Sequence, residues 1–324
     1  MRRTQAGADG VGTGLVARST NLTIEAILAE TNEGGGIALN DVSLTARDVV
    51  VRDDVLPSGR TAIAVGIGGG TSGRIERAAV LRSPMLGFNV SGVGTLATLA
   101  DVSIRDTRSV PSIVFTATGI ALQVHTAGVV ELQRVAIDRA STLAVLLDSW
   151  AEVTGADVAI RGTLPTIEGG AGGYAIQLQE GSAIDLERCE IAASLGVAVS
   201  TFTDRGVPPP TATFTDLSVT GTAGQACAPT CNAFGTALLA SIGASITATR
   251  FRIADNLQCG VQLVTGGTID LHDGIIEGNL VGANVQDAEF DLGRLQDRVI
   301  FRDNVRDLDS AALPVPGPIG SGGA

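Results

Sequence analysis

The stretch Val130-Glu-Leu-Gln-Arg-Val-Ala-Ile137 contains two apolar-x-apolar pairs separated by two residues, and this pattern recurs along the chain. Clean copies run over residues 184–191, 246–253 and 269–276, and looser copies end at Leu28, Val51, Leu81, Ile104, Ile160, Val219 and Phe301. Alternation of apolar and polar residues is typical of a strand that buries one face. Each of the eleven copies therefore predicts two short strands.

A column of small polar residues follows these copies. Three positions after each last apolar residue, nine of eleven residues are Asn, Asp, Ser or Thr, in the order Thr31, Asp54, Pro84, Thr107, Ala140, Thr163, Ser194, Thr222, Asn256, Asn279 and Asn304. The shortest and commonest spacing between copies is 23 residues. Self-similarity at such a period indicates a solenoid, with insertions in some of its turns.

A further short strand lies upstream of many copies and is commonly opened by glycine, as in Gly119-Ile-Ala-Leu-Gln-Val. Three short strands within one 23-residue unit cannot pair with each other, but each can pair with its counterpart one unit away. The pattern predicts three parallel sheets around a narrow core of Ile, Val, Leu and Ala. Eleven turns would make a rod about 50 Å long.

This repeat resembles that of right-handed parallel β-helix proteins of the pectate-lyase-like class, which are common among secreted and surface proteins of bacteria. The resemblance implies an all-β, single-stranded right-handed parallel β-helix solenoid of about eleven rungs. The helix would span residues 12–310, between a lead-in at 1–11 and a Pro/Gly-rich linker or disordered tail at 311–324. It also implies an extracellular or cell-surface location.

The composition of the chain limits the classes of partner that we expect it to bind. The 324 residues include 22 basic residues, all of them Arg, against 34 acids, for a net charge of −12. We expect no nucleic-acid partner, because phosphate binding needs a basic face. No run of 18 apolar residues occurs, so we expect no membrane insertion.

Three asparagines stand at equivalent turns of the last three units: Asn256, Asn279 and Asn304. Stacked side-chain amides can donate and accept hydrogen bonds along a column. The pattern favours a structural ladder, and the alternative is an amide row that binds a ligand.

Few residues suggest catalysis. His272 and Asp273 stand beside Asp270, and Asp185 lies in the same column as Asp270 on another turn. Such a column could hold paired carboxylates or a Ca²⁺ ion, and no other cofactor or metal is indicated. The resembling enzymes place acids and an Arg on one exposed sheet, here Arg250 or Arg188. Their Asp-Asp and Gly-His-Gly motifs have no counterpart at this site, which favours a column of solvated charges.

Aromatic residues and insertions could contact a polysaccharide or another cell-surface component. Insertions at 106–118, 161–172 and 220–234 leave the turn at the same corner, and binding loops on a solenoid commonly gather in this way. The single Trp150 and the single Tyr174 lie near this edge in the repeat pattern. The alternative interpretation is tolerated loop variation with both aromatic residues in the core.

The four cysteines divide into two kinds. Cys189 occupies an inward column and should be buried. Cys227 and Cys231 lie four residues apart around a proline and predict a small disulfide loop, with Cys259 as a rival partner. The Gly-rich start of the chain offers little cover for the first turn and would permit end-to-end association.

Taken together, the sequence favours a non-catalytic structural or adhesive module. The alternative is a polysaccharide lyase or glycoside hydrolase that uses acids on one sheet face.

Overall fold

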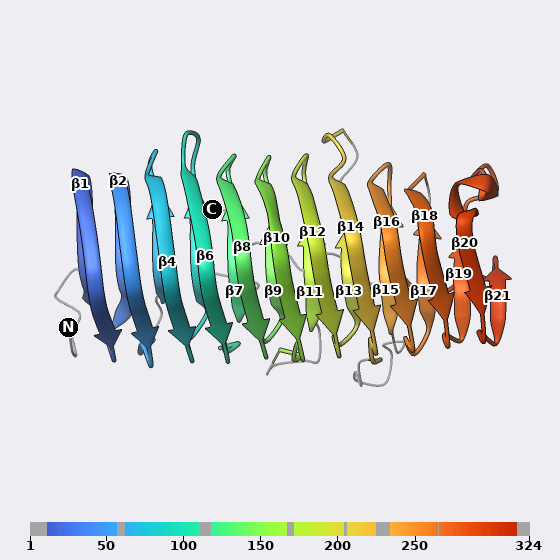
Figure 1. Ribbon diagram of the computed structural model, residues 1–324, viewed down its shortest axis with the longest axis horizontal. Helices are drawn as coiled ribbons and strands as arrows, with labels where there is room; N and C mark the ends of the chain where they lie inside the picture. Colours follow the sequence, from blue (N-terminus) through green and yellow to red (C-terminus); the bar gives the residue numbers. More distant parts are fainter. Residues whose placement is uncertain are drawn as a thin grey trace.

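The chain winds into a parallel β-solenoid of about eleven turns, which forms a rod in side view (Figure 1). The computed structural model describes residues 12–56, 62–110, 118–166, 172–203, 206–224, 234–264 and 266–315. Strands pair in parallel only with their counterparts in adjacent turns, so the predicted all-β solenoid is confirmed.

Each complete turn consists of a short strand followed by a long one. The first two turns are continuous strands, β1 (Gly12–Glu30) and β2 (Gly34–Arg52). The short strands are β3 (Ile63–Gly68), β5 (Leu86–Ser91), β7 (Ile120–His125), β9 (Leu143–Leu147), β11 (Tyr174–Leu178), β13 (Val197–Thr201), β15 (Thr236–Ser241), β17 (Cys259–Val264), β19 (Val281–Val285) and β21 (Arg306–Asp309). The long strands are β4 (Ser72–Leu81), β6 (Leu96–Arg105), β8 (Val129–Asp138), β10 (Glu152–Arg161), β12 (Ala183–Ala192), β14 (Thr211–Thr220), β16 (Ser245–Ala254), β18 (Thr268–Glu277) and the shorter β20 (Asp297–Arg302).

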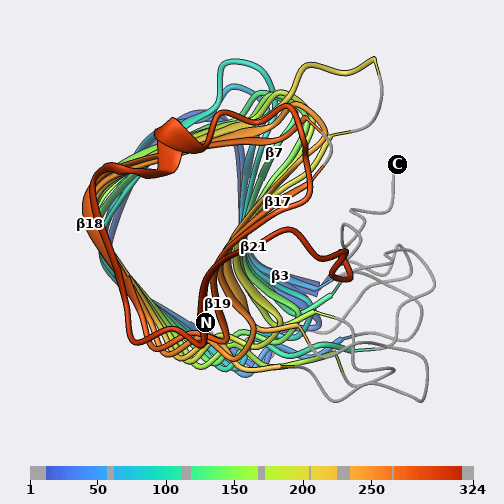
Figure 2. The same cartoon turned by 90° about the vertical axis from the view of Figure 1, so that its right-hand side faces the viewer.

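The long strand joins the two short strands that the sequence predicts. A residue with positive φ in its middle bends it, for example Arg134 in β8 (φ 55°) and Asp273 in β18 (φ 55°). The bent long strands form two faces of the rod and the short strands form the third, as the view along the axis shows (Figure 2). The bend explains why the apolar alternation breaks after each first pair.

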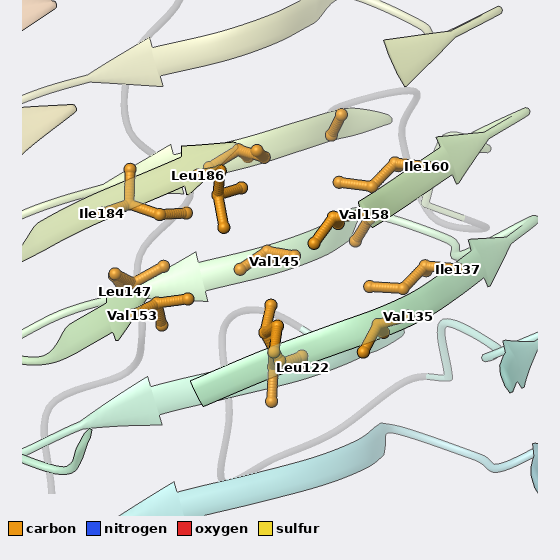
Figure 3. Close-up of a cluster of buried hydrophobic side chains, with 14 of the residues drawn as sticks. Leu122, Val135, Ile137, Val145, Leu147, Val153, Val158, Ile160, Ile184 and Leu186 are labelled. Carbon is orange, nitrogen blue, oxygen red and sulfur yellow. The ribbon is translucent and has the colours of Figure 1, made fainter. Parts of the chain in front are cut away.

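The main core is a column of stacked, mostly aliphatic side chains. One hydrophobic cluster extends from Ile24 to Leu295, and its members come from all three faces. Leu122, Val145 and Val158 illustrate how successive turns place side chains into it (Figure 3). Aliphatic residues fill most of this narrow interior, which accounts for the small number of aromatic ones.

Strand register corrects the sequence alignment by one residue in two turns. Ala29, not Leu28, pairs with Val51, and Val51 in turn pairs with Val80, not Leu81. The polar column therefore contains Asn32 and Ser83 in place of Thr31 and Pro84. With this correction ten of its eleven members are Asn, Asp, Ser or Thr, the exception being Ala140.

Both ends of the rod differ from the middle. At the far end, the 3₁₀ helix Leu292–Leu295 places Leu295 in the core, only 2% exposed. Residues just after β21 lie against the short strands, because Ala311 and Pro314 accept hydrogen bonds from Asn284 (3.0 Å) and Gln262 (3.2 Å). Side chains of β1, in contrast, are mostly exposed or half-buried.

Candidate functional site

The acids singled out in the sequence do not meet at one place. Asp270 and His272 project from β18, whereas Asp185 projects from β12. The register Asp185–Thr213–Thr247–Asp270 places the two carboxylates three turns apart. At the usual strand spacing this is about 14 Å.

Most of these side chains are bound to a residue of the neighbouring turn. Asp270 receives two hydrogen bonds from Arg294, from Nε and Nη2, both 2.6 Å. The guanidinium of Arg294 also lies over the ring of Phe290, 5.8 Å from its centroid. His272 Nδ1 lies 2.9 Å from Asp297 Oδ2. These contacts link β18 to the last turn of the rod.

Asp273 and Arg250 belong to a larger arrangement, a column at the bend of the long strands that alternates between Asp and Arg over ten turns. We call it the Asp–Arg column, and its members are Asp48, Arg77, Asp101, Arg134, Asp157, Arg188, Asp216, Arg250, Asp273 and Arg298. All ten have positive φ, between 49° and 60°. The first turn has Ala26 at this position, so the column contains five complete pairs.

Each Arg of the column donates hydrogen bonds from Nε and Nη2 to the two carboxylate oxygens of the Asp in the preceding turn. In the pair Arg134–Asp101, Nε donates to Oδ1 at 2.6 Å and Nη2 donates to Oδ2 at 2.8 Å. The pair Arg250–Asp216 has the same geometry at 2.7 and 2.9 Å. The remaining pairs are Arg77–Asp48, Arg188–Asp157 and Arg298–Asp273.

This geometry gives a physical reason for arginine in the column. A guanidinium presents parallel N–H donors that match both oxygens of a carboxylate, whereas the ammonium of lysine is a point charge that cannot form this fork. The hydrogen bonds from Arg134 and Arg250 lower the pKa of Asp101 and Asp216. The column is therefore ionised and internally neutral at pH 7.

A shorter column of the same kind lies at the next corner. Arg82 binds Asp53 through two hydrogen bonds of 2.6 Å, and Arg139 binds Asp106 at 2.7 and 2.9 Å. These four residues also have positive φ. Three of the later turns carry glycine at this corner (Gly162, Gly221 and Gly278), which adopts the same backbone without strain, and the others carry Ala193, Asp255 and Asp303.

The structure forms the amide ladder expected from the three asparagines. Asn256 donates from its backbone N–H (3.0 Å) and its Nδ2 (2.9 Å) to Asn279 Oδ1, and Asn279 donates in the same way to Asn304 Oδ1 (3.0 Å for both). Asn256 and Asn279 are almost completely buried. No face of these amides is open to a ligand, which favours a structural role.

The second turn carries a carboxyl group in the same buried column. Asp54 Oδ1 accepts hydrogen bonds from the backbone N–H (3.2 Å) and Nδ2 (3.3 Å) of Asn32. Its Oδ2 is buried and accepts no hydrogen bond from the described part of the chain. Burial raises the pKa of Asp54 to about 6, against the smaller opposing effect of the Asn32 donors.

The two candidate aromatic residues lie at opposite ends of the short strands. Tyr174 opens β11 and is only 4% exposed, packed in a second hydrophobic cluster with Leu143 and Val197. Trp150 follows β9 in a tight turn, is 56% exposed, and its ring lies against Gly181. The insertions begin at the corner where the long strands end, so Trp150 is not on their edge.

A shallow hollow lies over Gly274, which faces the ring of Phe251 from the preceding turn. Its lining includes members of the Asp–Arg column together with Ile275 and Ile300. Within the described residues, no group of three or more His, Cys, Asp or Glu side chains could hold a metal ion.

Cysteine placement follows the sequence prediction where it can be compared. Cys189 is 2% exposed, pairs in register with Val158, and burial raises the pKa of its thiol to about 12. Cys259 is also a buried free thiol. Cys227 and Cys231 lie outside the described residues.

Sequence reasoning missed the Asp–Arg column. In the clean copies the residue before the second apolar pair is Arg134, Arg188, Arg250 or Asp273, which suggests a row of arginines. The intervening aspartates lie in the looser copies, so the alternation becomes visible only after every turn is placed in register. Aligning this single position through all eleven copies would have found it.

No protein-family model, curated protein or solved structure matches this chain. In the part of the chain that the structure describes, no helix is long and apolar enough to span a membrane.

Proposed function

We propose that the chain is a rigid, non-catalytic β-solenoid module that acts as a structural spacer or adhesive segment of a secreted or cell-surface bacterial protein. The observation that carries this proposal is the Asp–Arg column. Residues that would serve a lyase or hydrolase are engaged by a neighbouring turn: both oxygens of Asp273 accept hydrogen bonds from Arg298, and Nε and Nη2 of Arg250 donate to Asp216. Such pairs join turns and leave few groups for substrate chemistry.

Carboxylate spacing supports the same proposal. The paired acids of glycoside hydrolases stand roughly 5–9.5 Å apart. Asp185 and Asp270 are three turns apart, about 14 Å at the usual strand spacing. The alternative function, a polysaccharide lyase or glycoside hydrolase, would require these acids to act separately.

The test is incubation of the purified chain with acidic polysaccharides, with and without Ca²⁺. We expect neither new reducing ends nor unsaturated products. Product formation that is lost in Asp270→Ala but kept in Asp287→Ala, an acid outside the site, would overturn the non-catalytic proposal.

The adhesive form of the proposal has its own test. Trp150 is the single tryptophan, so its fluorescence reports on one exposed turn. We expect a polysaccharide that contacts this turn to shift the emission, and Trp150→Phe to weaken binding. Binding on a glycan array without any fluorescence change would place the contact away from Trp150. If no glycan binds, only the spacer form of the proposal remains.

Location is tested by adding a protease to intact cells that produce the full protein. A secreted or surface-exposed module should be cleaved or found in the medium. Complete protection until the cells are lysed would contradict this part of the proposal.

A further inference from the structure

The five pairs of the Asp–Arg column are coupled to each other. Every Arg of the column except the last, Arg298, lies between the Asp that it binds in the preceding turn and another Asp in the following turn. The pKa of Arg134 is raised chiefly by its hydrogen bonds with Asp101, and in addition by the charge of Asp157. The same holds for Arg250, which lies between Asp216 and Asp273. Opposite charges therefore face each other between pairs as well as within them.

The core itself distinguishes poorly between turns. At one inward position seven successive turns carry Val49, Ala78, Val102, Val135, Val158, Cys189 and Leu217, all of them apolar. The next two turns are an exception, because Gly274 there leaves room for the ring of Phe251. At the polar corner, ten of eleven turns carry Asn, Asp, Ser or Thr. A turn stacked on the wrong neighbour would still bury aliphatic side chains and keep its strand hydrogen bonds. Repeats of this kind risk slipped or exchanged stacking.

A shift of one turn has a different effect on the charges. Where one turn is skipped, the junction places Asp against Asp or Arg against Arg, whereas skipping two turns restores an opposite-charge contact there. Like charges in direct contact are unfavourable and are used in proteins to reject wrong pairings.

We propose that the alternating Asp–Arg column is a register code, which rejects stacking offset by an odd number of turns and makes two turns the unit in which the rod can change length. This role is independent of whether the rod acts as a spacer. The code begins at Asp48, because Ala26 of the first turn carries no charge, and it ends at Arg298.

Exchanging the charges of a pair tests the code. Asp157→Arg combined with Arg188→Asp keeps a pair at these positions, but it creates two like-charge contacts, with Arg134 on one side and Asp216 on the other. We expect the thermal midpoint to fall by several degrees at low ionic strength, and most of the fall to disappear near 1 M salt, where charges are screened within about 3 Å. The matched control is Asp48→Arg with Arg77→Asp, which creates only one such contact and should lower the midpoint less.

Exchanging two adjacent pairs gives the decisive comparison. Adding Asp101→Arg and Arg134→Asp to the first exchange introduces four substitutions, yet the number of like-charge contacts stays at two. We expect the four-substitution variant to be about as stable as either single exchange, and clearly more stable than the sum of the two effects. Additive losses would overturn the proposal, as would single exchanges as stable as the parent chain.

Deletions provide a second readout. Removing residues 152–182 deletes one turn and places Arg134 beside Arg188, whereas removing residues 152–210 deletes two turns and places Arg134 beside Asp216. We expect the shorter variant, with two turns removed, to be the more stable one in low salt. If the one-turn deletion is equally stable, or is the only one to fold, the code does not act.

Discussion

Asp54 is a carboxyl group at a buried corner where Asn256 and Asn279 occupy equivalent positions in other turns. Its pKa of about 6 lies above the ordinary value near 4, so the folded protein binds an additional proton between these pH values. Stability from this group is therefore complete below about pH 4 and declines as pH rises to about 6. An uncharged amide at this position would avoid this decline in stability at higher pH.

We predict that Asp54→Asn raises the free energy of unfolding by about 2 kcal/mol at pH 7 and removes the decline between pH 4 and 6. Urea unfolding at several pH values measures this. The matched control is Asp53→Asn in the half-buried neighbour, whose pKa is lowered by its hydrogen bonds with Arg82. That variant should lose stability above pH 4, and the same sign for both variants would contradict the prediction.

Asn279 is the central member of the amide ladder. Asn279→Ala removes the acceptor for two donors of Asn256, one of them a buried backbone N–H. Leaving buried donors unpaired should cost about 2–3 kcal/mol in the free energy of unfolding. Asn304→Ala, at the half-buried end of the ladder, should cost less when the two are compared by urea unfolding. Equal costs would indicate that the ladder does not act as a column.

At the scale of strands, the bend in each long strand brings one Asp–Arg column residue into the left-handed region. Aspartate tolerates this backbone better than most residues, whereas arginine gains nothing from it by itself. The bidentate hydrogen bonds to the preceding turn supply the compensation. The bidentate hydrogen bonds of the guanidinium, more than its positive charge, should therefore be essential for the stability of the bend.

We predict that Arg134→Lys lowers the thermal midpoint and moves the pKa of Asp101 back toward its ordinary value, measured by NMR titration. The control is Arg108→Lys, because Arg108 forms no ion pair with any described residue. It should leave the midpoint unchanged. An undiminished shift of the Asp101 pKa in Arg134→Lys would show that charge alone is sufficient.

The pH dependence of the Asp–Arg column has the opposite sign to that of Asp54. The five aspartates have pKa values lowered mainly by their arginine hydrogen bonds. Their contribution is present above about pH 4 and is lost as pH falls through the folded-state values. We expect the urea midpoint to decrease below pH 4, and a variant with all five arginines changed to Gln to show a weaker decrease. An unchanged acid profile in that variant would contradict this.

Strands were predictable from the sequence because the apolar period of two is strong in every turn. The one-residue errors at Leu28 and Leu81 arose where an apolar residue adjoins the true inward residue, before Ala29 and after Val80, so that alternation alone fits two registers. The bend was hard to predict, since the clean copies carry Arg134, Arg188 and Arg250 at this position, and arginine does not favour positive φ; the aspartates that do tolerate it lie mostly in the looser copies. The partner of Asp273 becomes predictable only after every turn is aligned, and the partner of Asp270 is Arg294, which lies in the 3₁₀ helix outside the repeated strands.

At the scale of the whole molecule, stability should vary along the rod. Each turn contacts only its neighbours, so the terminal turns have a neighbour on one side only. We predict the strongest amide hydrogen-exchange protection in β8 to β14 and weaker protection in β1 and β21. Protection in β1 equal to that in β10 would show that something covers the first turn.

The alternation of Asp and Arg also doubles the translational period of the rod. Strands repeat at about 4.8 Å, but a given charge returns only every second turn, at about 9.6 Å. Diffraction from aligned rods should thus contain, beside the strong strand reflection, a weak layer line at twice that spacing. Its intensity would report how far the charge order extends along the fibre axis.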